Sequence, residues 1–246
     1  MGNVKIKKIA DYLIKDGNPI IDTNIYIISE GQKAIMVDCG GGIDKAFSYL
    51  DENKLELKYI FLTHSHFDHI YYLDEIAKKY KNVKVIASEK SALDDLNINM
   101  LGSLGEENRQ KCIDVFVKDK DKIYIEEGEK KFLDKDIKEV LNIKSIDDEM
   151  DFTKKESLKI EVIETPGHTY DSISLLMEYS GKEYLFSGDT IFKGSIGRTD
   201  LNGGSSEYMV DTLKKLKRKL KDDCLVLPGH GDNTVFKDWK KVFYRI

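Results

Sequence analysis

The hydrophobic residues of this chain form two patterns: short runs that are almost continuously apolar, and longer segments with helical spacing. In the first third, four apolar runs rich in isoleucine, valine and aromatic residues predict strands: 23–29, 33–39, 58–63 and 82–88. Two segments between them, 43–53 and 70–80, repeat apolar residues every three or four positions and predict helices. We therefore expect a unit in which strands alternate with helices.

The last third repeats this organisation. Four further apolar runs predict strands: 158–165, 172–179, 182–189 and 224–230. A helix is predicted at 205–220, and its basic run, 214–221, is expected to form a solvated surface face. Strands that are apolar on both faces are typical of sheets covered by helices.

The middle of the chain has a different composition. Residues 106–156 include 12 basic and 16 acidic residues, a net charge of −4. Short helical patterns at 109–117 and 132–141 lie between the charge clusters. We interpret this region as a charged, mostly helical insertion, about 98–156, within a single domain that spans 1–246. It is expected to be either a solvated surface module or a lid over a site.

Composition and charge exclude several classes of protein. The hydrophobic fraction of 41% is sufficient for a core, and the net charge of −5 argues against a nucleic-acid binder. No apolar run approaches the roughly 18 residues of a membrane span, and none resembles a signal peptide. Cys39, Cys112 and Cys224 are odd in number and form no CxxC motif, which is typical of a reducing compartment. A soluble, cytoplasmic protein is expected.

The candidate chemistry lies in the histidines. The segment THSHFDH, residues 63–69, holds three of the five histidines together with Asp68. His168 and His230 each follow a Pro-Gly pair at the end of a predicted strand, and Asp189 ends another strand in SGDT. Proline stops a sheet ladder and glycine allows a sharp turn, so each histidine can point across the sheet edge. Imidazole and carboxylate groups converging at strand ends predict a metal site.

The spacing within THSHFDH indicates two metal positions. Side chains alternate along an extended strand, so His64 and His66 project to the same side and can chelate one ion. After Phe67 the chain is expected to turn into a helix, which moves Asp68 and His69 toward a neighbouring position. Two adjacent metal sites are therefore predicted.

These motifs resemble the metallo-β-lactamase-fold superfamily, whose H-x-H-x-D-H is His64 to His69 here. The resemblance implies a four-layer αβ/βα sandwich of the α/β class, with the metals at one edge. It also implies a ligand set for each metal: His64, His66 and His168 for the first, and Asp68, His69 and His230 for the second, with Asp189 between them. Asp38 would brace the metal loop. An aspartate at 189, where some true β-lactamases use cysteine, disfavours antibiotic hydrolysis.

The segment SGDTIFKGSIGRTDLNGG, residues 187–204, is similar to the glyoxalase II-like branch of this superfamily. That branch hydrolyses the thioester of hydroxyacylglutathione and releases glutathione. A basic residue at the position of Arg198 lies near the glutathione moiety, so the resemblance implies that Arg198 contacts substrate. The alternative is that this glycine-rich turn only shapes the wall of the site.

The implied reaction depends on two divalent ions, zinc first, with iron or manganese as alternatives. Ions bridged by Asp189 would lower the pKa of a shared water to about 7. The resulting bridging hydroxide would attack the carbonyl of a thioester or related ester. Asp68 is a candidate proton shuttle. Asp68 and Asp189 are therefore the predicted catalytic residues.

Three other functions use the same scaffold. A mononuclear iron persulfide dioxygenase would use His64, His168 and Asp189, and a phosphodiesterase or lactonase would use the full ligand set. A metal-free binding scaffold would be expected to lack a ligand, and none of the seven is missing. The expected partner is a small-molecule substrate, with no membrane and no nucleic acid; the oligomeric state is left open.

Overall fold

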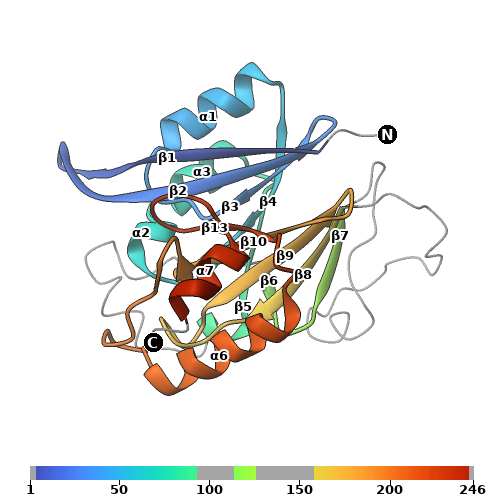
Figure 1. Cartoon of the computed structure of the whole chain (residues 1–246). Coiled ribbons are helices and arrows are strands. Elements are labelled where there is room, and N and C mark those ends of the chain that lie inside the picture. Colours follow the sequence, from blue (N-terminus) through green and yellow to red (C-terminus); the bar gives the residue numbers. More distant parts are fainter. Residues whose placement is uncertain (1–3, 93–113, 126–157, 244–246) are drawn as a thin grey trace.

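The structure is a computed structural model, and it describes residues 4–92, 114–125 and 158–243. Two six-stranded sheets form its centre (Figure 1). The strands of the first sheet, in spatial order, are β1 (Lys5–Lys15), β2 (Asn18–Glu30), β3 (Lys33–Val37), β4 (Glu56–Phe61), β5 (Lys84–Ser88) and β6 (Val115–Val117). β1, β2 and β3 are antiparallel neighbours, whereas β3 to β6 run parallel. The carboxyl end of β4 therefore lies beside those of β3 and β5.

The second sheet has the same number of strands and mixed directions. In spatial order they are β14 (Thr234–Val235), β13 (Leu225–Pro228), β10 (Lys182–Gly188), β9 (Ile173–Tyr179), β8 (Leu158–Glu164) and β7 (Lys122–Ile125). β9 is antiparallel to both β8 and β10, and β10 is parallel to β13. The carboxyl ends of β8, β10 and β13 consequently lie along one edge. A two-stranded hairpin follows β10, formed by β11 (Ile191–Phe192) and β12 (Ser195–Ile196).

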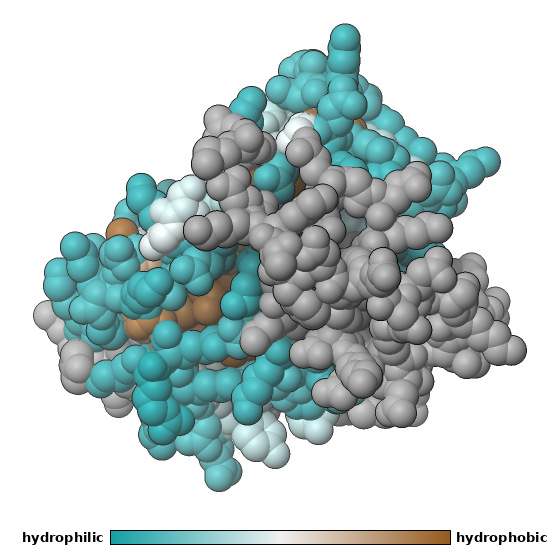
Figure 2. Space-filling view, turned by 90° about the vertical axis from the view of Figure 1, so that its right-hand side faces the viewer, coloured by the Kyte–Doolittle hydropathy of each residue, from teal (hydrophilic) through white to brown (hydrophobic). Residues whose placement is uncertain are grey.

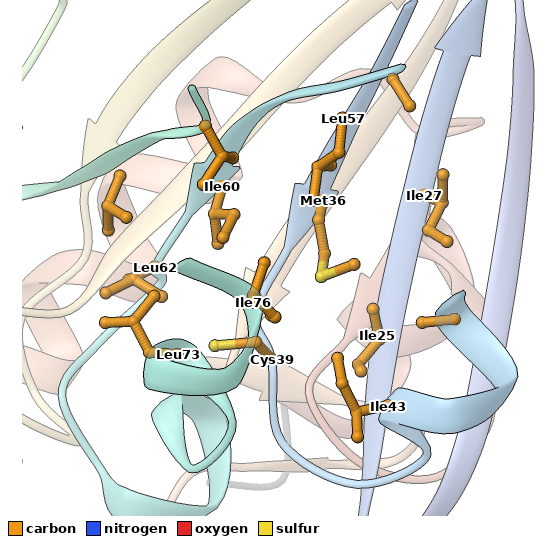
Figure 3. Close-up of a cluster of buried hydrophobic side chains, with 14 of the residues drawn as sticks. Ile25, Ile27, Met36, Cys39, Ile43, Leu57, Ile60, Leu62, Leu73 and Ile76 are labelled. Carbon is orange, nitrogen blue, oxygen red and sulfur yellow. The ribbon is translucent and has the colours of Figure 1, made fainter. Parts of the chain in front are cut away.

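Helices cover the outer face of each sheet (Figure 1). The first half contributes α1 (Ile43–Glu52), α2 (Phe67–Ile70), α3 (Leu73–Lys79) and the 3-10 turn η1 (Glu89–Ala92). The second half contributes α6 (Ser206–Lys219) and α7 (Phe236–Phe243). Figure 3 shows Ile43 of α1 and Ile76 of α3 directed toward Met36 of the first sheet, and all three side chains are buried. On the other side, Met209 and Leu213 of α6 pack with Val226 of β13.

A third hydrophobic cluster fills the space between the two sheets. Tyr26 of β2 and Phe186 of β10 meet there edge to face, with ring centroids 5.4 Å apart. Successive residues of β2 alternate between two cores, because Ile25 and Ile27 face the helices whereas Tyr26 and Ile28 face the second sheet. Both faces are buried, and this explains why the strand is continuously apolar.

The outer surface is polar, as the sequence predicts. Figure 2 shows hydrophilic residues over most of the coloured surface on the side that it presents. Helix α6 is capped by Ser205, whose hydroxyl accepts a hydrogen bond from the Tyr208 amide (3.3 Å). The apolar side of α6 is buried and its last turn is basic, which confirms the expected surface helix. In the described part of the chain, no helix combines the length and the apolar character that crossing a bilayer requires.

The predicted α/β class, with two sheets and outer helices, is confirmed. Three details of the sequence prediction are wrong. The helix expected at 70–80 is divided into α2 and α3, because the chain turns at Tyr71 and Tyr72. The long strand β1 was not predicted, since its apolar residues are interrupted by charged ones and only its pairing with β2 buries them.

The third correction concerns the charged middle of the chain. Helical spacing was expected over 109–117, but Val115–Val117 is strand β6 and pairs in parallel with β5. Likewise, β7 pairs with β8. The described part of the expected insertion thus supplies an edge strand to each sheet. The helical pattern at 132–141 lies outside the described residues, so the insertion at 98–156 and the single-domain organisation of 1–246 stay predictions.

Candidate metal centre

The carboxyl ends of four strands deliver the candidate ligands to one edge of the sandwich. The loop after β4 carries His64 and His66, and α2 carries Asp68 and His69. Asp189 directly follows β10. His168 and His230 lie in the loops after β8 and β13. Six of these side chains are buried, and His230 is partly exposed.

The structure brings all seven candidate side chains together in three overlapping groups. In each group, donor atoms lie within 4.8 Å of one another. The groups are His64, His66 and His168; Asp68, His69 and His230; and His64, His69 and Asp189. The first two groups match the two expected ligand sets. The third combines one histidine from each with Asp189, so this carboxylate lies between the two groups.

The contacts of Asp189 describe this arrangement in detail. Its Oδ1 lies 3.3 Å from His69 Nε2, and its Oδ2 lies 3.1 Å from His230 Nε2 and 3.5 Å from His168 Nε2. In the first group, His66 Nδ1 and His168 Nε2 are 2.9 Å apart. In the second, Asp68 Oδ2 lies 3.3 Å from His230 Nε2. Asp189 therefore contacts both groups.

Oxygen acceptors behind three of the histidines fix their orientation. His69 Nδ1 lies 2.8 Å from Asp38 Oδ2, and His168 Nδ1 lies 2.8 Å from the Arg198 carbonyl. His230 Nδ1 bonds to the Asp22 carbonyl. An acceptor at Nδ1 holds the imidazole proton there and leaves the lone pair of Nε2 directed into the site.

Asp38 connects the two groups through Thr63. Its Oδ1 accepts a hydrogen bond from the Thr63 amide and its Oδ2 one from the Thr63 hydroxyl, both at 2.8 Å. The Thr63 oxygen lies 3.1 Å from His64 Nδ1. Because its own proton is given to Asp38, this oxygen accepts the Nδ1 proton of His64. The backbone of Asp38 is left-handed (φ 58°), a conformation uncommon in residues other than glycine.

The donor atoms fit a divalent transition metal. His64 Nε2 is buried and has no hydrogen-bond partner among the described residues. Leaving such a group unsatisfied costs about 1–3 kcal/mol, so a ligand that accepts its lone pair would be favoured. The surrounding imidazole and carboxylate groups are the ligands that zinc, iron and manganese use in proteins.

The two groups differ in their electrostatics. Burial lowers the pKa of His64, and it lowers the pKa of His66 to about 4, so both imidazoles are neutral at pH 7. Burial opposes the charged form of His230 as well, but hydrogen bonds to Asp189 and Asp68 raise its pKa to about 10. For His69, too, neighbouring carboxylates outweigh burial and raise the pKa. The second group therefore attracts positive charge, as a proton or as a metal cation.

At two positions glycine is required because a side chain would collide with neighbouring atoms, and not because of turn geometry. A Cβ at Gly229 would lie 2.4 Å from Asp189 Oδ1 and 2.5 Å from His69 Cε1. A Cβ at Gly197 would lie 1.8 Å from the Asp189 carbonyl oxygen. The sequence interpretation of Pro-Gly-His as a sharp turn fits Gly167, whose φ is 146°. At Gly229 the physical reason is instead the close approach of two candidate ligands.

Arg198 occupies a different place from the other candidates. Its side chain is exposed, and the guanidinium donates two hydrogen bonds to Asp200 (2.7 and 2.8 Å). Its carbonyl, which the sequence could not single out, orients His168. The backbone role of Asp22 was missed for the same reason, since a carbonyl leaves no signature in the residue type.

Comparisons with known proteins agree with this geometry. A family model described as the metallo-beta-lactamase superfamily matches residues 19–230. A probable metallo-hydrolase of Bacillus subtilis, YqgX, is 32% identical over 215 residues, which cover 87% of each chain. Hydroxyacylglutathione hydrolase GloC of Haemophilus influenzae is 26% identical over 219 residues, covering 89% of this chain and 90% of GloC.

A solved structure shows the same similarity. The crystal structure of ETHE1 from Myxococcus xanthus has a TM-score of 0.62 and 25% sequence identity, covering 89% of this chain and 77% of that one.

Proposed function

Because this chain belongs to the metallo-β-lactamase superfamily and is a metallo-hydrolase of that superfamily, we propose that it is a binuclear hydrolase of thioesters or related esters. The observation that carries the proposal is the contact of Asp189 with members of both donor groups. A carboxylate whose Oδ2 lies near a histidine of each group suits two neighbouring cations.

We assign each donor group to one metal ion. His64, His66 and His168 would hold the first ion, and Asp68, His69 and His230 the second, with Asp189 contributing to both. Zinc is our first choice, with iron or manganese as alternatives. When bound, two divalent ions lower the pKa of a water molecule and polarise a carbonyl oxygen.

The protein groups around the site position the ligands and transfer protons. Asp38, the Arg198 carbonyl and the Asp22 carbonyl hold the imidazole protons on Nδ1, away from the donor atoms. Asp68 has two carboxylate oxygens, of which Oδ2 approaches His230. We assign Asp68 to proton transfer between the attacking water and the leaving group. Hydrolysis of a thioester then breaks the C–S bond and yields a carboxylate and a thiol.

The choice of a thioester rests on two supports. GloC, a hydroxyacylglutathione hydrolase, is similar to this chain along most of its length. Arg198 also presents an exposed guanidinium beside the loop that orients His168. An anionic substrate such as a glutathione conjugate could displace Asp200 from this guanidinium and form a charge-assisted bond in its place.

A second candidate is a mononuclear iron persulfide dioxygenase that uses His64, His168 and Asp189. The likeness to ETHE1 fits this alternative as well as it fits the hydrolase. His168 Nε2 and Asp189 Oδ2 lie 3.5 Å apart, within reach of a common ion. The hydrolase is preferred because Asp68, His69 and His230 form a second complete group of donors. A phosphodiesterase or a lactonase would use the same seven ligands and differ only in substrate.

One experiment separates these candidates. Protein stripped of metal is reloaded with zinc or with iron and assayed on a hydroxyacylglutathione thioester, a lactone, a phosphodiester and a glutathione persulfide. We expect the zinc form to bind two ions per chain and to release thiol from the thioester. One iron per chain with oxygen uptake on the persulfide would instead establish the dioxygenase.

A further inference from the structure

A buried carboxylate outside the candidate ligand set joins the two segments that carry the first donor group. Asp171 is 1% exposed. Its Oδ2 accepts one hydrogen bond from the Ser65 hydroxyl (2.7 Å) and another from the Ser91 hydroxyl (2.8 Å). Neither serine is near Asp171 in sequence, since 106 and 80 positions separate them from it.

The position of these contacts relates them to the candidate ligands. Ser65 lies between His64 and His66, and Asp171 lies three residues after His168. One hydrogen bond thus joins the chain segments of all three members of the first group. A backbone hydrogen bond from the Ile173 amide to the Thr63 carbonyl (2.8 Å) joins the same two segments beside it. Two attachment points fix the orientation of the segments, whereas one would leave a hinge.

Asp171 is an unfavourable residue to bury for stability alone. Its Oδ1 is buried and has no hydrogen-bond partner among the described residues. Two neutral hydroxyls therefore satisfy only one of its oxygens, and a carboxylate so placed is poorly solvated. A residue that serves packing alone would not need this charge, which points to a role in holding the two loops.

We propose that Asp171 is a positioning residue for the first metal: it holds the segment from His64 to His66 against the His168 loop and so sets the spacing of the first donor group. This inference rests on the proposed metal-binding function. The second group is oriented by other residues, since Asp38 contacts His69 and the Asp22 carbonyl contacts His230. Loss of Asp171 should therefore weaken one metal site selectively.

The chain offers a matched control in Ser91, which lies in η1. Ser91 donates to the same oxygen as Ser65, but it lies between no candidate ligands. Ser91→Ala removes one hydrogen bond from Asp171 and keeps the bond to Ser65. Ser65→Ala removes the bond that joins the two ligand segments and keeps the bond to Ser91.

The test is zinc affinity of the full-length, metal-free protein, measured by competition with a chromophoric chelator. We expect Asp171→Ala and Ser65→Ala to weaken one of the two zinc sites by about 10–100-fold and to change the other less than about threefold. Ser91→Ala should change neither site by more than about threefold. The double variant that combines Asp171→Ala with Ser65→Ala should bind zinc no more weakly than Asp171→Ala alone, because both changes remove the same interaction.

Further variants and readouts keep the proposal open to refutation. Asp171→Asn keeps an amide oxygen for both serine hydroxyls, so it should restore the affinity of the first site. If Asp171→Ala does not fold, Ser65→Ala tests the same bond. Equal zinc affinity in wild type and Ser65→Ala, with only a lower Tm of the metal-free protein, would show a structural role and overturn the inference. Wild-type protein that binds no zinc would overturn the proposed function itself.

Discussion

The two donor groups of the candidate metal centre differ in what surrounds them. The first consists of three imidazoles, and hydroxyl groups lie behind it: Thr63 contacts His64, and Ser65 bonds to Asp171. The second contains the carboxylate of Asp68, and that of Asp38 lies behind His69. Burial lowers the pKa of His64 in the first group, whereas in the second group hydrogen bonds to Asp189 and Asp68 outweigh burial and raise the pKa of His230. From this difference we infer that the metal affinities of neighbouring sites can be set separately by the residues behind their ligands.

The largest effect is expected where both groups meet. Asp189→Asn removes the charge that both groups share, so we expect both metals to bind more weakly and thioester turnover to fall by about 10²–10³-fold. Zinc content and initial rates measure the two effects. Asp211→Asn, an exposed carboxylate on α6, is the matched control and should leave both unchanged. Loss of only one metal in Asp189→Asn would contradict the proposal that Asp189 contributes to both metal sites.

A substitution at Gly229 tests whether the space beside the second group is necessary. The added Cβ would collide with Asp189 Oδ1 and His69 Cε1, so Gly229→Ala should weaken the second site most, by about 10–100-fold in zinc affinity. The control is Gly181→Ala, in the turn between β9 and β10, where a Cβ meets nothing within 4 Å. Its left-handed backbone should cost about 1–2 kcal/mol of stability with no change in zinc affinity. Unaltered zinc binding in Gly229→Ala would count against the observed packing.

Substitutions of the residues behind the imidazoles should change the metal affinities of the two groups to different extents. Asp38→Asn weakens the acceptor of His69 directly and that of His64 only through Thr63, so we expect a loss of about 10-fold or more at the second site and a smaller loss at the first. Thr63→Val removes the hydroxyl that contacts His64 directly and His69 only through Asp38, so it should weaken the first site more than the second. Chelator competition resolves the two sites, and identical losses in both variants would refute separate tuning.

The smallest effect is expected outside both groups. Arg198→Ala keeps the carbonyl that orients His168, so metal content should not change. If the guanidinium binds an anionic thioester, KM should rise about tenfold with kcat nearly unchanged, the pattern of lost uniform binding. Asp200→Ala frees the guanidinium and should lower KM. Steady-state kinetics of both variants test this, and an unchanged KM in both would mean that the turn only shapes the site wall.

The sequence was most informative where a local pattern determines the outcome. The THSHFDH segment places four candidate ligands within six positions, and strands buried on both faces, such as β2, are recognisable from their apolar runs. The cluster of ligands at one sheet edge followed from strand ends alone. The site could be predicted because four of the candidate ligands are close in sequence and the other three follow recognisable strand ends.

Features that depend on long-range pairing were missed. Strand β1 mixes lysines with isoleucines and becomes a strand only through its register with β2. Strand β6 has three residues and is specified by its parallel neighbour β5. The bond between Ser65 and Asp171 joins residues 106 positions apart, and the carbonyls of Asp22 and Arg198 act without their side chains. Such contacts depend on the folded arrangement, so residue types do not reveal them.

Metal stoichiometry tests the binuclear arrangement most directly. Elemental analysis of wild-type protein, His66→Ala and His230→Ala, prepared in zinc and freed of excess metal, should give two ions per chain for the wild type and about one for each variant. The single ion should lie in the second group in His66→Ala and in the first group in His230→Ala. A wild-type protein without any transition metal, or variants that retain two ions, would contradict the assignment of the seven side chains as ligands.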